Sequence, residues 1–225
     1  MTERVATLVE HPESAVIAVV GGTGAQGRGL AGRWSAAGHR VIIGSRDSQR
    51  AESAAASVGG GVVGATNLAA VDAASVVVLA VPWSAHEDTL RELQPSLVGR
   101  LVIDCVNPMG FDRLGPFPLV VQHGSAAEQA ATLLPDAVVV GAFHHVSAER
   151  LLDERVTSMD GDVLVVGDDR QAVGVVIALA NRIPGLRGIY AGRLRNAHQI
   201  EALTANLIAV NRRYKTLAGI RITGL

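Results

Sequence analysis

The sequence predicts an α/β protein with a doubly wound parallel sheet and a small C-terminal α/β lobe. Short apolar runs alternate about six times with helical segments in residues 15–145, which is the pattern of right-handed βαβ units. The pattern changes after about residue 145, where shorter elements lead into the longest helical stretch of the chain. We therefore expect one sheet domain in 15–145, a small domain in 146–225 and an N-terminal extension in 1–14.

The predicted strands are runs of Ala, Val, Leu and Ile without polar alternation. Such runs are typical of strands that are buried on both faces of a parallel sheet, and many of them end at glycine. In chain order the predicted strands are 15–20, 40–43, 62–63, 76–80, 101–104, 137–140, 163–166 and 188–190. The last two belong to the smaller lobe.

The predicted helices lie between these runs. In chain order they are 27–37, 48–58, 67–71, 84–93, 126–134, 170–182 and 196–214. Segment 107–118 is rich in Pro and Gly and is predicted to be a loop. In the last helix, Ile200, Leu203, Leu207 and Val210 recur at helical spacing, and the apolar residues cover more than one face. A small lobe cannot cover every face, so this helix predicts a homodimer.

Composition and charge exclude several classes of protein. A formal net charge of −1 gives no basic excess for nucleic acid or an anionic membrane. The apolar runs are well short of the ~18 residues of a membrane span, and the N-terminus lacks the apolar core of a secretory signal. Cys105 is the single cysteine and cannot form an intrachain disulfide. We therefore expect a cytoplasmic protein.

The first functional motif is a glycine-rich turn between the first strand and the first helix. Gly22-Thr23-Gly24-Ala25-Gln26-Gly27 reads G-x-G-x-x-G in the strand–turn–helix context of a dinucleotide site. Gly22 permits the tight turn, Gly24 lets a pyrophosphate approach the backbone, and Gly27 lets the helix pack on the sheet. Unpaired N–H groups at the helix N-terminus would face the phosphates. We expect a cofactor-binding loop of a Rossmann domain; the alternative is a glycine-rich turn without a ligand.

The end of the second strand predicts which dinucleotide binds. NAD sites usually have Asp or Glu here to bind the ribose hydroxyls, whereas this chain has Ser45 and Arg46, with Arg50 one helical turn later. Two guanidinium groups near one point match a 2′-phosphate, which accepts charge-assisted and bidentate hydrogen bonds. Asp47 comes one residue too late and is expected to be a helix N-cap. The motif predicts NADP(H); the alternative for each arginine is a solvated surface side chain.

Two further motifs follow predicted strands, at the edge where open α/β sheets bind ligands. Val81-Pro82-Trp83 follows the fourth strand; proline stiffens the turn, and Trp83 either flanks a flat ring or caps the core.

Ala142-Phe143-His144-His145-Val146 follows the sixth strand. The adjacent histidines would diverge in an extended segment, and the other histidines show no zinc spacing, so we expect no metal site. At least one of the pair is expected to face the cleft; the alternative is a hydrogen-bonded loop histidine.

Several enzyme classes are excluded because their residues are missing. The Tyr-x-x-x-Lys motif of short-chain dehydrogenases is absent, since neither Tyr190 nor Tyr214 has a lysine four residues later. Lys215 is the single lysine, so a mid-chain lysine acid is absent, and so is a Gly-x-Ser-x-Gly elbow. The remaining pattern is a nicotinamide site with few strong acids or bases, which favours hydride transfer between two cofactors.

In this order the motifs resemble the NADPH-dependent F420 reductases, the F420H2:NADP oxidoreductase family. The resemblance covers segments 21–31, 44–46, 81–83, 142–148 and 196–204, and so most of the chain from residue 17 onward. It implies a Rossmann domain with a small C-terminal lobe, usually as a homodimer. It also implies hydride exchange between NADP(H) and the deazaflavin ring of coenzyme F420.

The resemblance implies roles for individual residues. Thr23 would contact the pyrophosphate side, and Ser45, Arg46 and Arg50 would hold the 2′-phosphate. The segment 144–146 would line the junction of the two rings. We expect His144 to act as the donor that polarises the deazaflavin, and Val146 to press the rings together and exclude water.

The substrate is less tightly predicted than the dinucleotide. Loop 107–118 departs from the family pattern, although it would shape the deazaflavin pocket. Two alternatives therefore stay open. One is another NADPH-dependent Rossmann reductase that acts on imines or ferric iron, and the other is a non-enzymatic NADP(H)-sensing regulator.

Overall fold

A computed structural model describes residues 15–225, and the predicted N-terminal extension, 1–14, lies outside the described residues. An eight-stranded sheet of order β10-β9-β8-β5-β4-β1-β2-β3 forms the centre of the molecule. Its strands are β1 (Val16–Val20), β2 (Arg40–Ser45), β3 (Val63–Thr66), β4 (Val76–Leu79), β5 (Leu101–Asp104), β8 (Val138–Gly141), β9 (Gly161–Gly167) and β10 (Leu186–Tyr190). Neighbouring strands of this sheet are parallel, apart from the antiparallel pair of β8 and β9.

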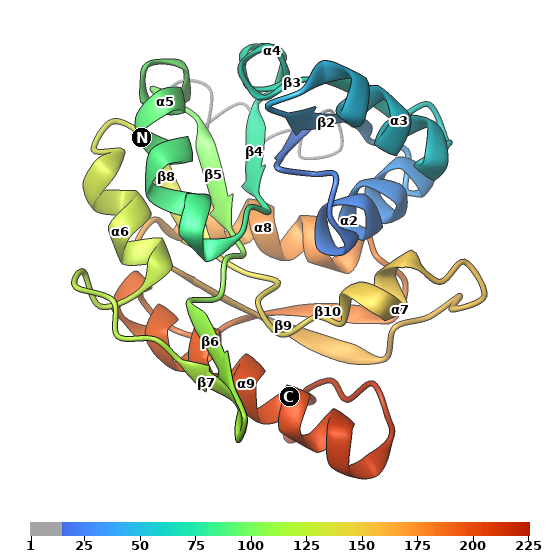
Figure 1. The fold of residues 1–225 in the computed structure, drawn as a ribbon, viewed down its shortest axis with the longest axis vertical. Coiled ribbons are helices and arrows are strands. Elements are labelled where there is room, and N and C mark those ends of the chain that lie inside the picture. The colour runs from blue at the N-terminus through green and yellow to red at the C-terminus, as the bar shows by residue number, and fades with distance from the viewer. Residues whose placement is uncertain (1–14) are drawn as a thin grey trace.

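Helices cover both faces of the sheet (Figure 1). One face packs against α2 (Ala25–Ala36), α3 (Ser48–Val58), α7 (Ala148–Leu152) and α8 (Arg170–Asn181). The other packs against α4 (Asn67–Ala73), α5 (His86–Leu97), α6 (Ala126–Leu133) and α9 (Ala197–Tyr214). Along β1, Ile17 and Val19 enter the first core, and Ala18 and Val20 enter the second. Burial on both faces explains why the strand sequences are continuously apolar, and the predicted fold class is confirmed.

The two strands of the predicted second lobe continue the main sheet. β9 pairs with β8 through Val140 opposite Gly167, and β10 pairs with β9. The apolar patterns of the two strands predict their existence but not the direction in which they pair. The division of the chain near residue 145 stays a prediction.

The sequence predicts a loop at 107–118, but this segment contains the antiparallel hairpin of β6 (Met109–Asp112) and β7 (Gly115–Pro118). The prediction was wrong because local turn chemistry outweighs the Pro- and Gly-rich composition. The Asp112 carboxylate accepts the N–H groups of Leu114 at 2.7 Å and Gly115 at 3.1 Å, which closes the turn. A two-stranded ribbon also tolerates proline, because each strand needs ladder bonds on one side only. The hairpin lies beside α9 (Figure 1).

Helix α7, which the sequence analysis does not predict, is held on α2 by Arg33. The guanidinium donates to four main-chain carbonyls at 2.7–3.0 Å, those of Arg150, Leu151, Asp153 and Val156. These bonds fix the chain that follows segment 142–147 against the helix that follows the glycine turn.

Candidate active site

The largest group of predicted site residues meets at the point where the strand order reverses, between β1 and β4. Open α/β sheets bind ligands outside the carboxyl ends of the strands at such a point. A cavity of about 360 Å³ lies there, and we term it the dinucleotide pocket. It is lined by Gly21, Thr23, Gly24, Ala25, Gln26, Gly27, Ser45, Arg46, Asp47, Arg50, Asn67, Ala80, Val81, Pro82, Ala85 and Thr89.

The three motif glycines meet different surroundings. A Cβ on Gly22 would lie 2.6 Å from the Val19 carbonyl oxygen, and one on Gly27 would lie 2.5 Å from the Gly22 Cα atom. A Cβ on Gly24 would meet no atom of residues 15–225 within 4 Å. The fold therefore requires Gly22 and Gly27, whereas Gly24 borders open space at the start of α2. Within the described part of the chain, no side chain caps this helix. This free space beside unpaired N–H groups fits a pyrophosphate.

The end of β2 has the donors that a 2′-phosphate requires. Arg46 and Arg50 are exposed beside the pocket, and within the described part of the chain no hydrogen bond or ion pair occupies either guanidinium. Ser45 is buried, and its hydroxyl accepts the Asp47 N–H at 3.2 Å. The Asp47 carboxylate caps α3 by accepting the Gln49 N–H at 2.9 Å, so its predicted role as N-cap is confirmed.

Replacing Arg46 by alanine is expected to raise the KM for NADPH about ten- to a hundredfold, because a charge-assisted bond of roughly 1.5–3 kcal/mol is lost. The KM for NADH should barely change. Steady-state kinetics with both dinucleotides measures the two values. Arg40→Ala, at the exposed amino end of the same strand, is the matched control. An equal loss with NADH and NADPH would show that Arg46 is structural.

Part of the Val81-Pro82-Trp83 motif lies at the dinucleotide pocket. Val81 and Pro82 line the pocket, but Trp83 does not. Its indole ring lies 5.3 Å from the His86 ring, centroid to centroid, and packs against the core. The structure therefore favours the core-capping interpretation of Trp83 over the ring-flanking one.

His144 is buried and does not line the dinucleotide pocket. Within the described residues, neither of its ring nitrogens has a hydrogen-bond partner. Burial lowers the pKa of His144 to about 4, against the raising influence of Asp104, so the ring is neutral at pH 7. Its main-chain carbonyl accepts two side-chain donors, the Asn107 amide at 2.8 Å and the Thr204 hydroxyl at 2.9 Å. The backbone is thus fixed from two sides.

The residues around His144 face the core more than the pocket. Ala142 and Val146 pack in the apolar core, and the His145 ring contacts the Asp162 carbonyl through Nε2 at 2.9 Å. His145 thus has the hydrogen-bonded arrangement that was the alternative to a cleft-facing histidine. Phe143 has a φ of 65°, an uncommon value for a residue with a side chain. Its carbonyl accepts the Gln26 amide at 3.1 Å, which ties this segment to the glycine turn.

Sequence reasoning missed a buried polar network behind the strand ends. His86 and Asp104 are fully buried, and His86 Nε2 lies 2.7 Å from Asp104 Oδ2. His86 Nδ1 lies 2.8 Å from Gln129 Oε1. Burial lowers the pKa of His86, but Asp104 and both hydrogen bonds outweigh it, and the net shift is upward. One signal was available, because Asp104 is the charged residue in the otherwise apolar run 101–104.

Glu201 joins α9 to the start of α6. Its carboxylate accepts the N–H groups of Ala126 at 2.9 Å and Ala127 at 3.1 Å. Burial raises the pKa of Glu201 to about 7, and the nearby Asp104 adds to the rise, although the two N–H groups oppose it. The ordinary value for the same carboxyl is 4.5.

This raised pKa predicts a loss of stability with rising pH. Below pH 4.5 Glu201 is protonated in both the folded and the unfolded chain, and its contribution is fully present. As the pH rises to about 7, the unfolded chain ionises first, and stability falls by about 3 kcal/mol. Urea unfolding at pH 5 and pH 7.5 should show most of this fall, because the unfolded chain is already partly ionised at pH 5, and Glu201→Gln should remove it. The exposed Glu149→Gln is the control; an unchanged slope in Glu201→Gln would contradict the assignment.

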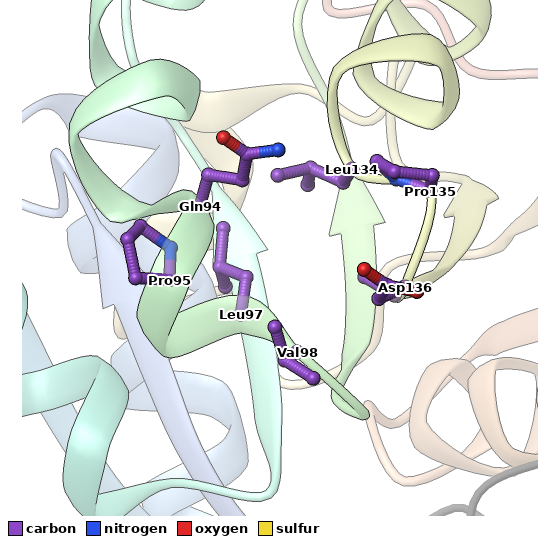
Figure 2. Close-up of a pocket in the computed structure, with 8 residues that line it drawn as sticks. Gln94, Pro95, Leu97, Val98, Leu134, Pro135 and Asp136 are labelled. Carbon is purple, nitrogen blue, oxygen red and sulfur yellow. The ribbon is translucent and has the colours of Figure 1, made fainter.

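A second cavity, of about 130 Å³, shares no lining residue with the dinucleotide pocket. Figure 2 shows the residues that line it. It is lined by the ends of α5 and α6 and the turns that follow them, including Gln94, Leu97, Val98, Leu134, Pro135 and Asp136. These turns lead into the amino ends of β5 and β8, so the cavity is at the sheet edge opposite the dinucleotide pocket. In residues 15–225, no three His, Cys, Asp or Glu side chains are grouped to hold a metal ion.

The fold and this pocket define a Rossmann-type oxidoreductase that takes NADP(H). Residues 16–108 match the family model described as NADP oxidoreductase, coenzyme F420-dependent. The F420-dependent NADP reductase of Methanothermobacter marburgensis is 42% identical over 222 residues, which are 93% of this chain and 98% of that protein. The chain belongs to the F420-dependent NADP reductase family, so the resemblance seen in the motifs is confirmed.

Two further comparisons support the same family and cover nearly the whole of this chain. The F420-dependent NADP reductase of Methanothermobacter thermautotrophicus is 43% identical over 221 residues, which are 93% of this chain and 95% of that protein. A solved structure from Arthrobacter superimposes with a TM-score of 0.80 at 27% identity and covers 92% of this chain and 98% of that one. The similarity therefore includes the C-terminal elements as well as the dinucleotide-binding half.

Proposed function

We propose that the dinucleotide pocket and the adjoining segment 142–147 are where this chain performs the reaction of its family. That reaction is the transfer of a hydride between NADP(H) and coenzyme F420. The observation that supports this site best is the pairing of an open space at Gly24 with the guanidinium groups of Arg46 and Arg50, which have no partner among residues 15–225. A pyrophosphate and a 2′-phosphate need these two features.

The residues of the pocket would hold the dinucleotide by its phosphates. N–H groups at the start of α2 would bind the pyrophosphate, and Ser45, Arg46 and Arg50 would bind the 2′-phosphate. When bound, NADPH supplies the hydride that the deazaflavin accepts. The chain's own contribution is to orient the two rings and to exclude water. Orientation of the reacting rings is the main way in which a protein accelerates hydride transfer between two cofactors.

We propose chemical roles for two side chains of segment 142–147. We assign the donor role to His144 because its ring is neutral and neither ring nitrogen has a partner within the described residues. Both nitrogens are buried, so the role requires the ring to become accessible when the deazaflavin binds. Val146 would exclude water between the rings. Cys105 is an unsuitable nucleophile, because burial raises the pKa of its thiol and its Sγ donates to the Leu79 carbonyl at 2.8 Å. We therefore propose direct transfer without a covalent enzyme intermediate.

The test is a single turnover with purified protein, coenzyme F420 and NADPH that carries deuterium at the transferred position. Deazaflavin absorbance should fall on mixing, and the label should appear in the reduced deazaflavin. Full exchange of the label with solvent in the first turnover would rule out direct transfer. Binding of NADPH without any turnover would favour the sensing regulator instead.

We also propose a homodimer formed through the hairpin–helix surface, which we define by the exposed apolar side chains of β6–β7 and α9. These are Phe111, Leu114, Phe117, Val210 and Tyr214. Side chains of this kind gather at subunit interfaces more often than on free surfaces. Neither β6 nor β7 pairs with the main sheet, so this surface stands apart from the core of the fold.

Light scattering at micromolar concentration is expected to give twice the mass of the chain. Phe111→Asp should reduce it to the mass of the monomer, because a charge would be buried at the interface. Leu68→Asp, at an exposed leucine of α4, is the matched control and should leave the dimer intact. A monomeric unaltered protein would remove the proposal.

The cellular location and the domain boundaries stay predictions. Among the helices of residues 15–225, none is both long enough and apolar enough to span a membrane. We propose a cytoplasmic enzyme, as the sequence analysis expects.

A further inference from the structure

Asn67 is a residue of the dinucleotide pocket that no motif singles out. It is the first residue of α4, and its side chain is 5% exposed. Its Oδ1 atom accepts the Gly21 N–H at 3.3 Å and lies 2.9 Å from where a Cβ on Gly44 would be. The Gly22 N–H donates to the Gly44 carbonyl at 3.0 Å. The side chain therefore lies where the glycine turn meets the end of β2.

Helix capping does not explain this side chain. Asn is a common N-cap residue, but here Thr66 has that position and accepts the Ala69 N–H at 3.2 Å. Asn67 is one residue inside the helix. Its amide is therefore available for a contact outside α4.

The nitrogen of the Asn67 amide is available to a ligand. A primary amide has one acceptor oxygen and two N–H donors. Gly21 uses the oxygen, and within residues 15–225 no hydrogen bond uses Nδ2. Nδ2 is also not among the polar atoms that are sealed in the core without a partner, and Asn67 borders the open pocket.

The position of Asn67 indicates which part of the dinucleotide it meets. On one side lies the glycine turn, which would bind the pyrophosphate; on the other lie Ser45 and Arg46, which would bind the 2′-phosphate. The adenosine ribose links these two phosphate groups in NADP(H). We infer that Asn67 donates from Nδ2 to the adenosine ribose, and that the neutral charge of its side chain permits the 2′-phosphate of NADP(H) beside it.

The charge of the side chain at this point affects which dinucleotide binds. This inference rests on the dinucleotide pocket proposed above. A neutral donor beside the ribose tolerates the 2′-phosphate. A carboxylate at the same point would repel that phosphate but would accept hydrogen bonds from two free ribose hydroxyls, as the acidic residue of NAD sites does. Asn67→Asp changes this charge with almost no change in shape. It also retains the oxygen that accepts the Gly21 N–H.

The experiment is calorimetric titration of Asn67→Asp with NADPH, NADH, 2′,5′-ADP and 5′-AMP, alongside circular dichroism. The Kd for NADPH and 2′,5′-ADP should rise about ten- to a hundredfold, whereas the Kd for NADH and 5′-AMP should stay level or fall. Asn67→Leu, which removes the donor without adding charge, should weaken NADPH and NADH equally, by about two- to tenfold.

Asn181→Asp is the matched control. The Asn181 side chain accepts the Gly188 N–H at 2.8 Å, so it makes the same kind of bond on α8, outside the residues that line the pocket. This variant should leave all four Kd values unchanged. An unchanged ratio of NADPH to NADH affinity in Asn67→Asp would overturn the inference while the pocket assignment stands. An unaltered protein that binds neither NADPH nor 2′,5′-ADP would overturn the pocket assignment as well.

Discussion

Replacing Gly24 by valine is expected to abolish NADPH binding in a chain that still folds. The backbone at Gly24 has φ −77° and ψ 172°, which valine adopts readily, and none of the described residues has an atom within 4 Å of a Cβ there. The two methyl groups would therefore project into the open space at the start of α2. A pyrophosphate needs this space to reach the N–H groups of the turn.

The measurement is NADPH titration by calorimetry, with circular dichroism and thermal unfolding on the same samples. Gly27→Val is the matched contrast, because its Cβ would lie 2.5 Å from the Gly22 Cα atom. That variant should lose stability, whereas Gly24→Val should unfold near the temperature of the unaltered protein. A folded Gly24→Val protein with normal NADPH affinity would place the phosphates elsewhere on the molecule.

The dinucleotide-binding half of the chain could be predicted from the sequence because its signals lie within single elements. Its signals are local: an apolar run that is buried on both faces, a turn that admits only glycine, and a capping Asp47 in front of a helix. Each signal depends on residues within one turn or strand. The strand at 101–104 and the helix at 48–58 accordingly have the bounds that the sequence predicts.

The features that escaped prediction depend on contacts between distant segments. Helix α7 is held by Arg33, whose four acceptors are main-chain carbonyls that no side-chain pattern reveals. The hairpin at 109–118 is closed by the Asp112 side chain, which composition does not show. The pair of His86 and Asp104 forms between α5 and β5. Asn67 likewise becomes a candidate pocket residue only through its contact with the glycine turn, where its side chain accepts the Gly21 N–H.

His144→Ala is expected to lower kcat by about ten- to a thousandfold, as the loss of one positioned donor does, with little change in the Kd for NADPH. The structure makes this substitution informative. Asn107 and Thr204 hold the carbonyl of residue 144 rather than its ring, and an alanine retains that carbonyl. The variant should therefore lose the imidazole and keep the course of the backbone.

The pH dependence of kcat tests the same role independently. Because the pKa of His144 is lowered to about 4, the ring takes up a proton only near that pH and stays neutral from pH 5.5 to 8. Removing it should lower the whole pH–kcat profile by one factor without moving its midpoints. A midpoint near pH 6.5 that disappears in His144→Ala would contradict the neutral donor and indicate a charged one.

His145→Ala separates a chemical role from a packing role. Its ring is as buried as that of His144, but Nε2 contacts the Asp162 carbonyl of β9. Loss of this ring should lower the free energy of unfolding by about 1–3 kcal/mol, because a buried partner is left unpaired, and should change kcat less. If both variants lose stability and activity in the same proportion, His144 is a packing residue. A loss of kcat confined to His144→Ala in a protein of normal stability would assign the donor to that ring, since its two nitrogens, unlike Nε2 of His145, have no partner within the described residues.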